Sequence, residues 1–342
     1  MMQRTGSIVC ALILAVAAGV AVPSADAANC TTQSQLTPPQ RDALAGAARN
    51  LMSEAQLGSV QAIRNNTLPA VAADFSGIAA SFTGLQPLIQ NASITIENVY
   101  DLDSSSDPAS AQQTEFFCGS PVVMMTFNGL PPAHYGLAIV HATGVPKPQQ
   151  VALILARGTD NRWLLAGIIS KPLTEGGHDG LWYWVSARKF AQANKQWTAW
   201  FYYRLAVGLL SPADFLSSPN LQTLAKETDQ VKPSNLPGDR PITLTGRGGT
   251  FTVTSIATTT ALGPLDLDVH FTPDAAQAAQ LHDPPAARAQ LIDLMSVLLA
   301  QHPDLQDGFH GMWVHADQGN ASIFALEVPM NGIRAGASPV AR

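Results

Sequence analysis

The chain has 342 residues and a formal net charge of −6, from 19 lysines and arginines against 25 aspartates and glutamates. Without a basic run, this balance argues against nucleic acid or an anionic membrane surface as the partner. Hydrophobic residues make up 46% and charged residues 13% of the chain, which excludes a disordered protein. The length exceeds that of one usual domain, and we therefore expect two.

Residues 1–27 have the three parts of a secretory signal peptide. Arg4 supplies a short positive region, residues 8–22 are apolar throughout, and Ala25 to Ala27 form the small-x-small pattern of a cleavage site. The apolar run is shorter than the about 20 residues of a membrane helix, and no later segment reaches that length. We predict cleavage near Ala27, a mature chain in the periplasm or outside the cell, and no membrane span.

Two cysteines, Cys30 and Cys118, remain once cleavage removes Cys10. A lone pair in an oxidising compartment usually forms one disulfide, which here would tie the mature N-terminus to the body of the first domain. Two separate free thiols are the alternative. Lipid attachment at Cys30 is disfavoured, because Asn29 rather than a small residue precedes it.

Residues 28–175 predict an α+β domain. After a polar, loose stretch at 31–38, residues 39–58 and 69–89 carry apolar side chains at helical spacing. The period then changes to two. The alternating segments are 93–102, 113–118, 122–127 and 134–141, followed by a hairpin. Helices followed by four or five antiparallel strands give an α+β arrangement.

The hairpin that ends this domain, LARGTDNRWLLAGI, turns at Gly158 to Asn161, and Trp163 opens its final strand. Amphipathic helices followed by a curved sheet with such a hairpin resemble the cone-shaped domain of the nuclear-transport-factor-2-like superfamily, over roughly residues 40–175. The resemblance implies a fold only. None of the superfamily's catalytic positions can be matched here, so it implies no activity.

The next segment, residues 181–206, holds four of the six tryptophans and three of the five tyrosines. We expect two helices, the first capped by Asp179 and the second running from Trp197 to Leu210. Over about 180–212 they resemble one tetratricopeptide-type helical hairpin. The large and small residues that match are Tyr183, Ala187, Phe190, Ala199, Tyr203 and Ala206. No second copy follows, so the hairpin must lean on its neighbours.

Aromatic side chains surround the second of these helices, which is typical of a buried helix. We therefore interpret residues 176–231 as a bridge between two domains. A pocket wall at the domain junction and an exposed protein-binding surface are the alternatives. A ligand at the junction would contact Trp182, Trp184, Trp200, Tyr203 and His178.

Residues 232–241 contain three prolines and a glycine, and we expect a linker there. The domain that follows, 242–334, has a ββαββ-like pattern. Its long helix is capped by Asp283, and its closing hairpin turns at Asp317 to Asn320. We expect a loose tail at 335–342.

The strand LDLDVHF of this C-terminal domain alternates strictly, and places Asp266, Asp268 and His270 together on the face opposite its apolar residues. Two carboxylates and an imidazole suit zinc or manganese. The closing hairpin adds His315 and Asp317. If the two strands were adjacent with these faces aligned, the five side chains would converge on one divalent metal. The alternative is ordinary outward-facing polar residues on half-buried strands.

Motifs that specify a reaction are missing from the sequence: it has no serine elbow, no H-E-x-x-H and no Walker or dinucleotide glycine pattern. The first hypothesis is therefore a non-enzymatic secreted or periplasmic module, without a cofactor, that binds a small molecule or an envelope protein at the aromatic junction. The second is a metal-dependent, hydrolase-like enzyme that uses Asp266, Asp268 and His270. The third is structural packing in a larger envelope assembly. The ligand and the oligomeric state stay open.

Overall fold

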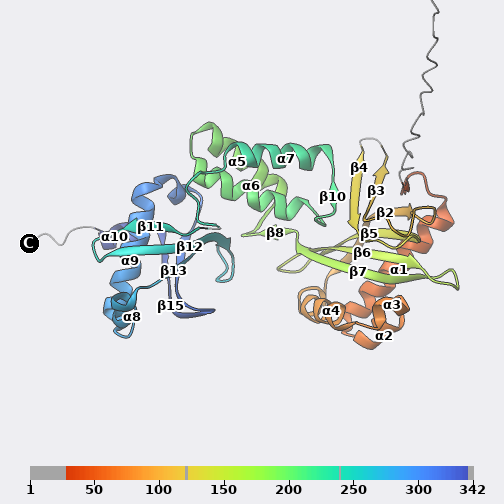
Figure 1. Ribbon diagram of the computed structural model, residues 1–342, viewed down its shortest axis with the longest axis horizontal. Helices are drawn as coiled ribbons and strands as arrows, with labels where there is room; N and C mark the ends of the chain where they lie inside the picture. Colours follow the sequence, from red (N-terminus) through yellow and green to blue (C-terminus); the bar gives the residue numbers. More distant parts are fainter. Residues whose placement is uncertain (1–27, 120–121, 239, 338–342) are drawn as a thin grey trace, which may run out of the picture.

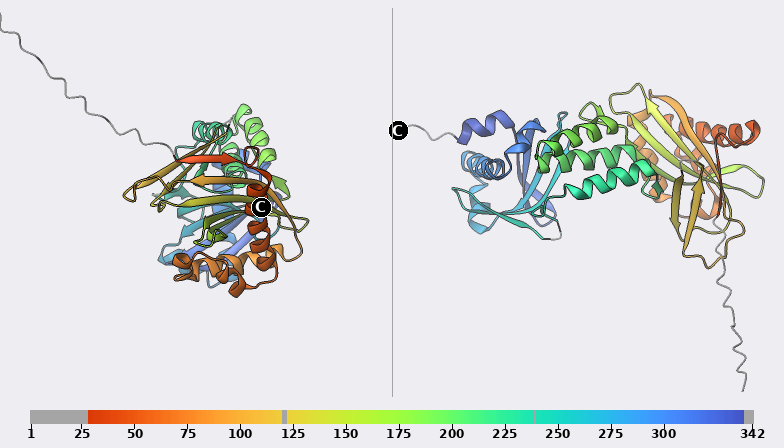
Figure 2. Two further views of the ribbon diagram at one scale, coloured as in Figure 1. Left: turned by 90° about the vertical axis from the view of Figure 1, so that its right-hand side faces the viewer. Right: turned by 90° about the horizontal axis from the view of Figure 1, so that it is seen from above.

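The computed structural model describes residues 28–119, 122–238 and 240–337, and the predicted signal peptide at 1–27 lies outside them. The chain is an α+β protein, as the sequence predicts. An N-terminal and a C-terminal unit lie at opposite ends of the molecule, and a layer of helices spans the distance between them (Figures 1 and 2). Among the described residues, no helix is long and apolar enough to cross a membrane.

The N-terminal unit packs four helices against a five-stranded antiparallel sheet of order β1-β2-β5-β6-β7. The helices are α1 (Pro38–Gln56), α2 (Val60–Asn65), α3 (Pro69–Ala72) and α4 (Ser76–Ile89). The strands are β1 (Asn29–Thr32), β2 (Ser93–Asp103), β5 (His134–Thr143), β6 (Gln149–Arg157) and β7 (Trp163–Pro172). A smaller sheet of β3 (Gln113–Cys118), β4 (Val123–Asn128) and β10 (Leu216–Ser217) packs on the other face of the large one. Both faces of the large sheet are therefore buried.

Two expectations for this unit need correction. The helix predicted over 69–89 is split, because α3 ends at Ala72 and α4 begins at Ser76, with Phe75 buried at the break. The stretch expected to be loose at 31–38 begins inside β1, whose residues pair with β2. Hydrogen bonding to a neighbouring strand, which composition does not reveal, orders this polar segment.

The disulfide between Cys30 and Cys118 is confirmed. It joins β1 of the large sheet to the end of β3 in the small sheet, and both cysteines pack in the same apolar core. The disulfide therefore fastens the first described strand to a part of the domain 88 residues away in sequence.

The bridge consists of α5 (Gly180–Gln192), α6 (Gln196–Leu210) and α7 (Pro219–Gln230), preceded by the short hairpin of β8 (Thr174–Glu175) and β9 (His178–Asp179). Asp179 caps α5 as expected, since its carboxylate accepts a hydrogen bond of 2.8 Å from the backbone N–H of Trp182. The aromatic residues of α6 lie in the same apolar core as the C-terminal sheet. Leu236, in the segment expected to be a linker, also packs on this core. The bridge and the C-terminal sheet thus form one packed unit.

The C-terminal unit is a five-stranded sheet of order β11-β12-β13-β14-β15, with helices on one face. The strands are β11 (Ile242–Thr245), β12 (Thr250–Thr259), β13 (Asp266–Thr272), β14 (Gly311–Gln318) and β15 (Ala321–Pro329). The helices are α8 (Ala275–Gln280), α9 (Pro284–Gln301), the 3-10 helix η1 (Pro303–Asp307) and α10 (Met330–Ala337). Figure 1 shows α9 and α10 on the side of the sheet that faces away from the N-terminal unit. Strand β11 was not expected, and α10 includes the first residues of the predicted loose tail.

The central pair, β13 and β14, is parallel, whereas the other neighbours in this sheet are antiparallel. A parallel pair needs a crossover connection, and α8, α9 and η1 supply it on the covered face of the sheet. The opposite face carries the polar side chains of β13 and β14.

Candidate metal centre

The two strands expected to carry metal ligands are direct neighbours in the sheet. Asp268 pairs with Trp313, and His270 pairs with His315. The residues between them, Leu267 and Val269, are fully buried on the helix-covered side. Alternation along both strands therefore directs Asp268, His270 and His315 to the open face, as the sequence condition requires.

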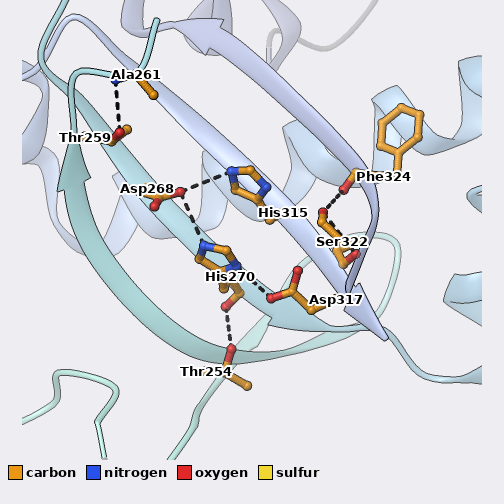
Figure 3. A network of polar contacts seen from close by, with 10 residues as sticks. Thr254, Thr259, Ala261, Asp268, His270, His315, Asp317, Ser322 and Phe324 are labelled. Atoms are coloured by element: carbon orange, nitrogen blue, oxygen red, sulfur yellow. Dashed lines mark hydrogen bonds and ion pairs between the residues drawn. The ribbon is translucent and has the colours of Figure 1, made fainter. Parts of the chain in front are cut away.

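The ligand atoms of this triad converge on one point. Oδ1 of Asp268 lies 3.2 Å from Nε2 of His315 and 3.5 Å from Nε2 of His270. Figure 3 shows the carboxylate of Asp268 directed at both rings, which are stacked with their centroids 4.5 Å apart. Ligands about 2.1 Å from a tetrahedral zinc ion are about 3.4 Å from one another. The two measured distances bracket this value, and all three ligand atoms lie within 4.8 Å of one another, as a shared ion requires.

The hydrogen bonding of the triad indicates what is needed between these atoms. Oδ1 of Asp268 is shielded from solvent and has no hydrogen-bond partner. Nδ1 of His270 lies 2.6 Å from Oδ2 of Asp317, and an ionised carboxylate can only accept a hydrogen bond, so Nδ1 is the donor of this pair. In the neutral ring, Nε2 of His270 is then a lone-pair acceptor facing a carboxylate oxygen. Two acceptors at this distance are stable only with a cation or a proton between them.

The Asp317 carboxylate therefore occupies the position of an outer partner of a metal-bound histidine. Such a carboxylate fixes the tautomer and the ring orientation and increases the basicity of the nitrogen that binds the metal. Asp317 follows His315 by two residues on β14, so alternation directs its carboxylate to the same open face, where it reaches Nδ1 of His270. The sequence expectation of a direct ligand is thus changed to a supporting role.

His315 is the most enclosed member of the triad, with 12% of its side chain exposed. Burial lowers the pKa of His315, the neighbouring His270 lowers it further, and the carboxylates of Asp268 and Asp317 act in the opposite direction. Trp313 packs against it, with ring centroids 4.4 Å apart. The lowered pKa favours the neutral imidazole, which is the form that binds a metal.

Asp266 does not join this group, which corrects the prediction of five converging side chains. It is 1% exposed and lies beside His310, with Oδ1 at 3.1 Å from Nδ1 of that ring. Residues two apart on a strand are about 6 to 7 Å apart, too far to share an ion that is bound this closely by Asp268. Sequence reasoning missed two neighbours of Asp266, His310 and Glu327. Glu327 pairs with Trp313, so it lies on the same face, and only the strand pairing reveals this.

The residues expected to line a pocket at the aromatic junction do not converge. His178 and Trp182 stack with ring centroids 3.5 Å apart, and both are exposed. Trp184 instead donates from Nε1 to Glu227 at 2.7 Å, and Tyr203 is buried in the core. Trp200 lines a separate groove of about 510 Å³ beside the 232–240 segment. These five side chains, four on α5 and α6 and one on β9, are thus divided between a surface, the core and a groove.

No family model, no curated protein and no solved structure matches the chain. The resemblances to the nuclear-transport-factor-2-like domain and to the tetratricopeptide hairpin therefore stay predictions. A function for the chain can therefore be inferred only from the geometry of its residues.

Proposed function

We propose that this protein binds a divalent transition metal through Asp268, His270 and His315, and that it acts as a metal-dependent, hydrolase-like enzyme. The observation that carries the proposal is the solvent-shielded Oδ1 of Asp268, which has no hydrogen bond and faces Nε2 of both histidines. Removing a carboxylate oxygen from water without a partner is costly, and a bound cation removes that cost.

The donor set selects among metals. Two imidazoles and one carboxylate suit zinc, manganese or ferrous iron, whereas calcium and magnesium prefer oxygen ligands alone. The three side chains remain between 12% and 30% exposed, so the triad lies near the surface of the open face and not in the core. Three protein ligands with one accessible position are the arrangement of catalytic zinc sites, where the metal supplies an activated water for hydrolysis.

The test is a metal titration of the mature chain, residues 28–342, stripped with a chelator and dialysed. Zn²⁺, Mn²⁺ and Fe²⁺ are added separately, and binding is followed by calorimetry and by thermal unfolding. Saturation at about 100 times the Kd adds about 2.7 kcal/mol to the free energy of unfolding. His270→Gln and His315→Gln should each remove the share of this stabilisation that the triad supplies, and His282→Gln, in the exposed turn before α9, is the matched control. A wild-type chain that gains no stability from any of the three ions would overturn the proposal.

The catalytic part is tested separately, on a panel of ester, phosphoester and amide substrates. Turnover should disappear after dialysis against a chelator, return with the metal that binds, and be lost in His315→Gln. A chain that binds the metal but turns over none of these substrates keeps the metal centre and refutes the hydrolase assignment.

A second candidate function is binding of an envelope protein at the start of α5. The observation that favours it is a cluster of exposed apolar side chains there, Leu181, Trp182 and Val185, beside the ring of His178. Patches of this kind on soluble units mark interaction sites. The double variant Leu181→Ser/Val185→Ser on α5 should abolish capture of the partner. Leu262→Ser should not, because Leu262 is similarly exposed but lies in the loop between β12 and β13. Equal capture by both variants would exclude this surface.

We further propose that the chain acts in the periplasm or outside the cell. The Cys30–Cys118 disulfide supports this compartment, because cytosolic reductants keep such pairs reduced. A mature N-terminus at Ala28 in protein recovered from the periplasm or the medium is the expected result. Retention of the full-length chain in the cytosol would contradict it.

A further inference from the structure

A second group of ligand-capable side chains lies next to the triad on the same open face. Asp266, at the start of β13, meets His310, which directly precedes β14, and Glu327 of β15. Nδ1 of His310 is 3.1 Å from Oδ1 of Asp266 and 3.9 Å from Oε1 of Glu327. The ligand atoms of the three residues lie within 4.8 Å of one another.

The carboxylates of Glu327 and Asp266 can approach each other here because position 311 is glycine. A Cβ atom on Gly311 would lie 2.4 Å from Oε1 of Glu327 and 3.1 Å from Oδ1 of Asp266. The two carboxylate oxygens thus lie directly over the Gly311 backbone, in the volume that any other residue would fill. A side chain at position 311 would therefore push the carboxylates of Glu327 and Asp266 away from their present positions.

The two carboxylates of this group have too few hydrogen-bond donors unless a cation binds. Asp266 is 1% exposed, and Oε1 of Glu327 is shielded from solvent and has no hydrogen-bond partner. One half-exposed imidazole faces both carboxylates. Buried carboxylates are stable when paired, protonated or bound to a metal, and one histidine supplies too few donors to satisfy both.

We propose that Asp266, His310 and Glu327 form a second divalent-cation site, separate from the Asp268–His270–His315 triad. One imidazole and two carboxylates suit zinc or manganese. Trp313 stands between Asp268 and Glu327 in the strand register, so the two sites are neighbours that do not share a ligand. This site is built from its own residues and does not depend on the proposed function.

The experiment is to count bound zinc ions in the full mature chain by native mass spectrometry after equilibration with Zn²⁺ and desalting. We expect two ions in the wild type and one ion in Glu327→Gln, His310→Gln or His270→Gln. The double variant His270→Gln/Glu327→Gln should bind none. Glu97→Gln, at an exposed carboxylate of the N-terminal unit, is the control and should keep two.

Gly311→Ala keeps every ligand but should displace the carboxylates of Glu327 and Asp266, and should therefore reduce the count to one ion. The remaining ion, at the triad, should be lost in Gly311→Ala/His270→Gln. Because Glu327 is on the outer strand β15 and partly exposed, its glutamine variant should fold even if substitution of buried Asp266 does not. One ion in the wild type that Glu327→Gln leaves in place would overturn the second site and keep the first. One ion lost in Glu327→Gln but kept in His270→Gln would support the second site and refute the triad.

Discussion

Asp317→Asn is the substitution that tests how the triad is built. The carboxylate accepts a hydrogen bond of 2.6 Å from Nδ1 of His270, and makes no contact with the point where a metal would lie. The asparagine carbonyl can still accept this bond, so the tautomer is kept and only the negative charge is lost. Asp317→Ala loses both the charge and the orientation of the ring.

The expected size follows from this difference. Loss of an outer partner of a metal-bound histidine costs about 10-fold to 100-fold in metal affinity, or about 1.4 to 2.7 kcal/mol. We place Asp317→Asn at the lower end and Asp317→Ala at the upper end, since the second leaves the ring free to rotate. His270→Gln, which lacks a ligand, should bind zinc more weakly than either Asp317 variant.

The assay is competition for Zn²⁺ against a chromophoric chelator at pH 7, with Asp307→Asn as the matched control. Asp307 pairs with Lys195 on the surface and does not touch the triad. Zinc affinities of both Asp317 variants equal to the wild type would refute the reasoning, because His270 could then not bind the metal through Nε2 with Nδ1 bonded to Asp317.

Three further predictions concern stability. Cys30→Ser with Cys118→Ser should lower the free energy of unfolding of the N-terminal unit by about 4 to 5 kcal/mol in the chain-entropy model, measured in denaturant, and leave the C-terminal unit unchanged; equal loss in both units would contradict it. Burial lowers the pKa of His302, so the unfolded chain binds a proton more readily than the folded chain, and the free energy of unfolding should fall as the pH drops below about 6.5. His302→Phe should weaken this pH dependence, measured by urea unfolding at several pH values. A pH dependence unchanged in His302→Phe would count against this cause. Tyr202→Phe should cost about 1 to 3 kcal/mol in thermal or denaturant unfolding, because the buried carbonyl of Gly308 loses its 2.7 Å partner; no loss of stability would refute this.

Local patterns of the C-terminal unit were readable from the sequence because they depend on neighbours along the chain. The alternation of β13 assigns its two faces, and Asp283 marks the start of α9, as expected from the sequence. The Cys30–Cys118 pair was confirmed because only two cysteines remained to pair in the expected mature chain.

The membership of the site depends on contacts between strands, and these were not readable. The parallel pairing of β13 with β14 places His315 beside His270, and it puts Asp317 at Nδ1 of that ring while Asp268 faces Nε2. The same pairing leaves Asp266 beside His310 and Glu327, which come from segments with no recognisable metal motif. One strand pattern thus supplied residues to two clusters, and periodicity alone cannot separate them.

The aromatic stretch, interpreted from the sequence as a bridge with a ligand pocket as one alternative, also supports the face that carries the two ligand clusters. Two residues of α6 form hydrogen bonds to the segment that leads into β14. Thr198 Oγ1 donates to the carbonyl of Asp304 at 2.7 Å, and Tyr202 OH donates to the carbonyl of Gly308. A Cβ on Gly308 would lie 2.4 Å from the Thr198 side chain, so the chain approaches α6 as closely as glycine permits. Burial raises the pKa of Tyr202 to about 12, which keeps its hydroxyl a donor at any physiological pH. Since His310 follows Gly308 by two residues, the position of α6 determines where β14 begins and therefore where both clusters obtain their histidines.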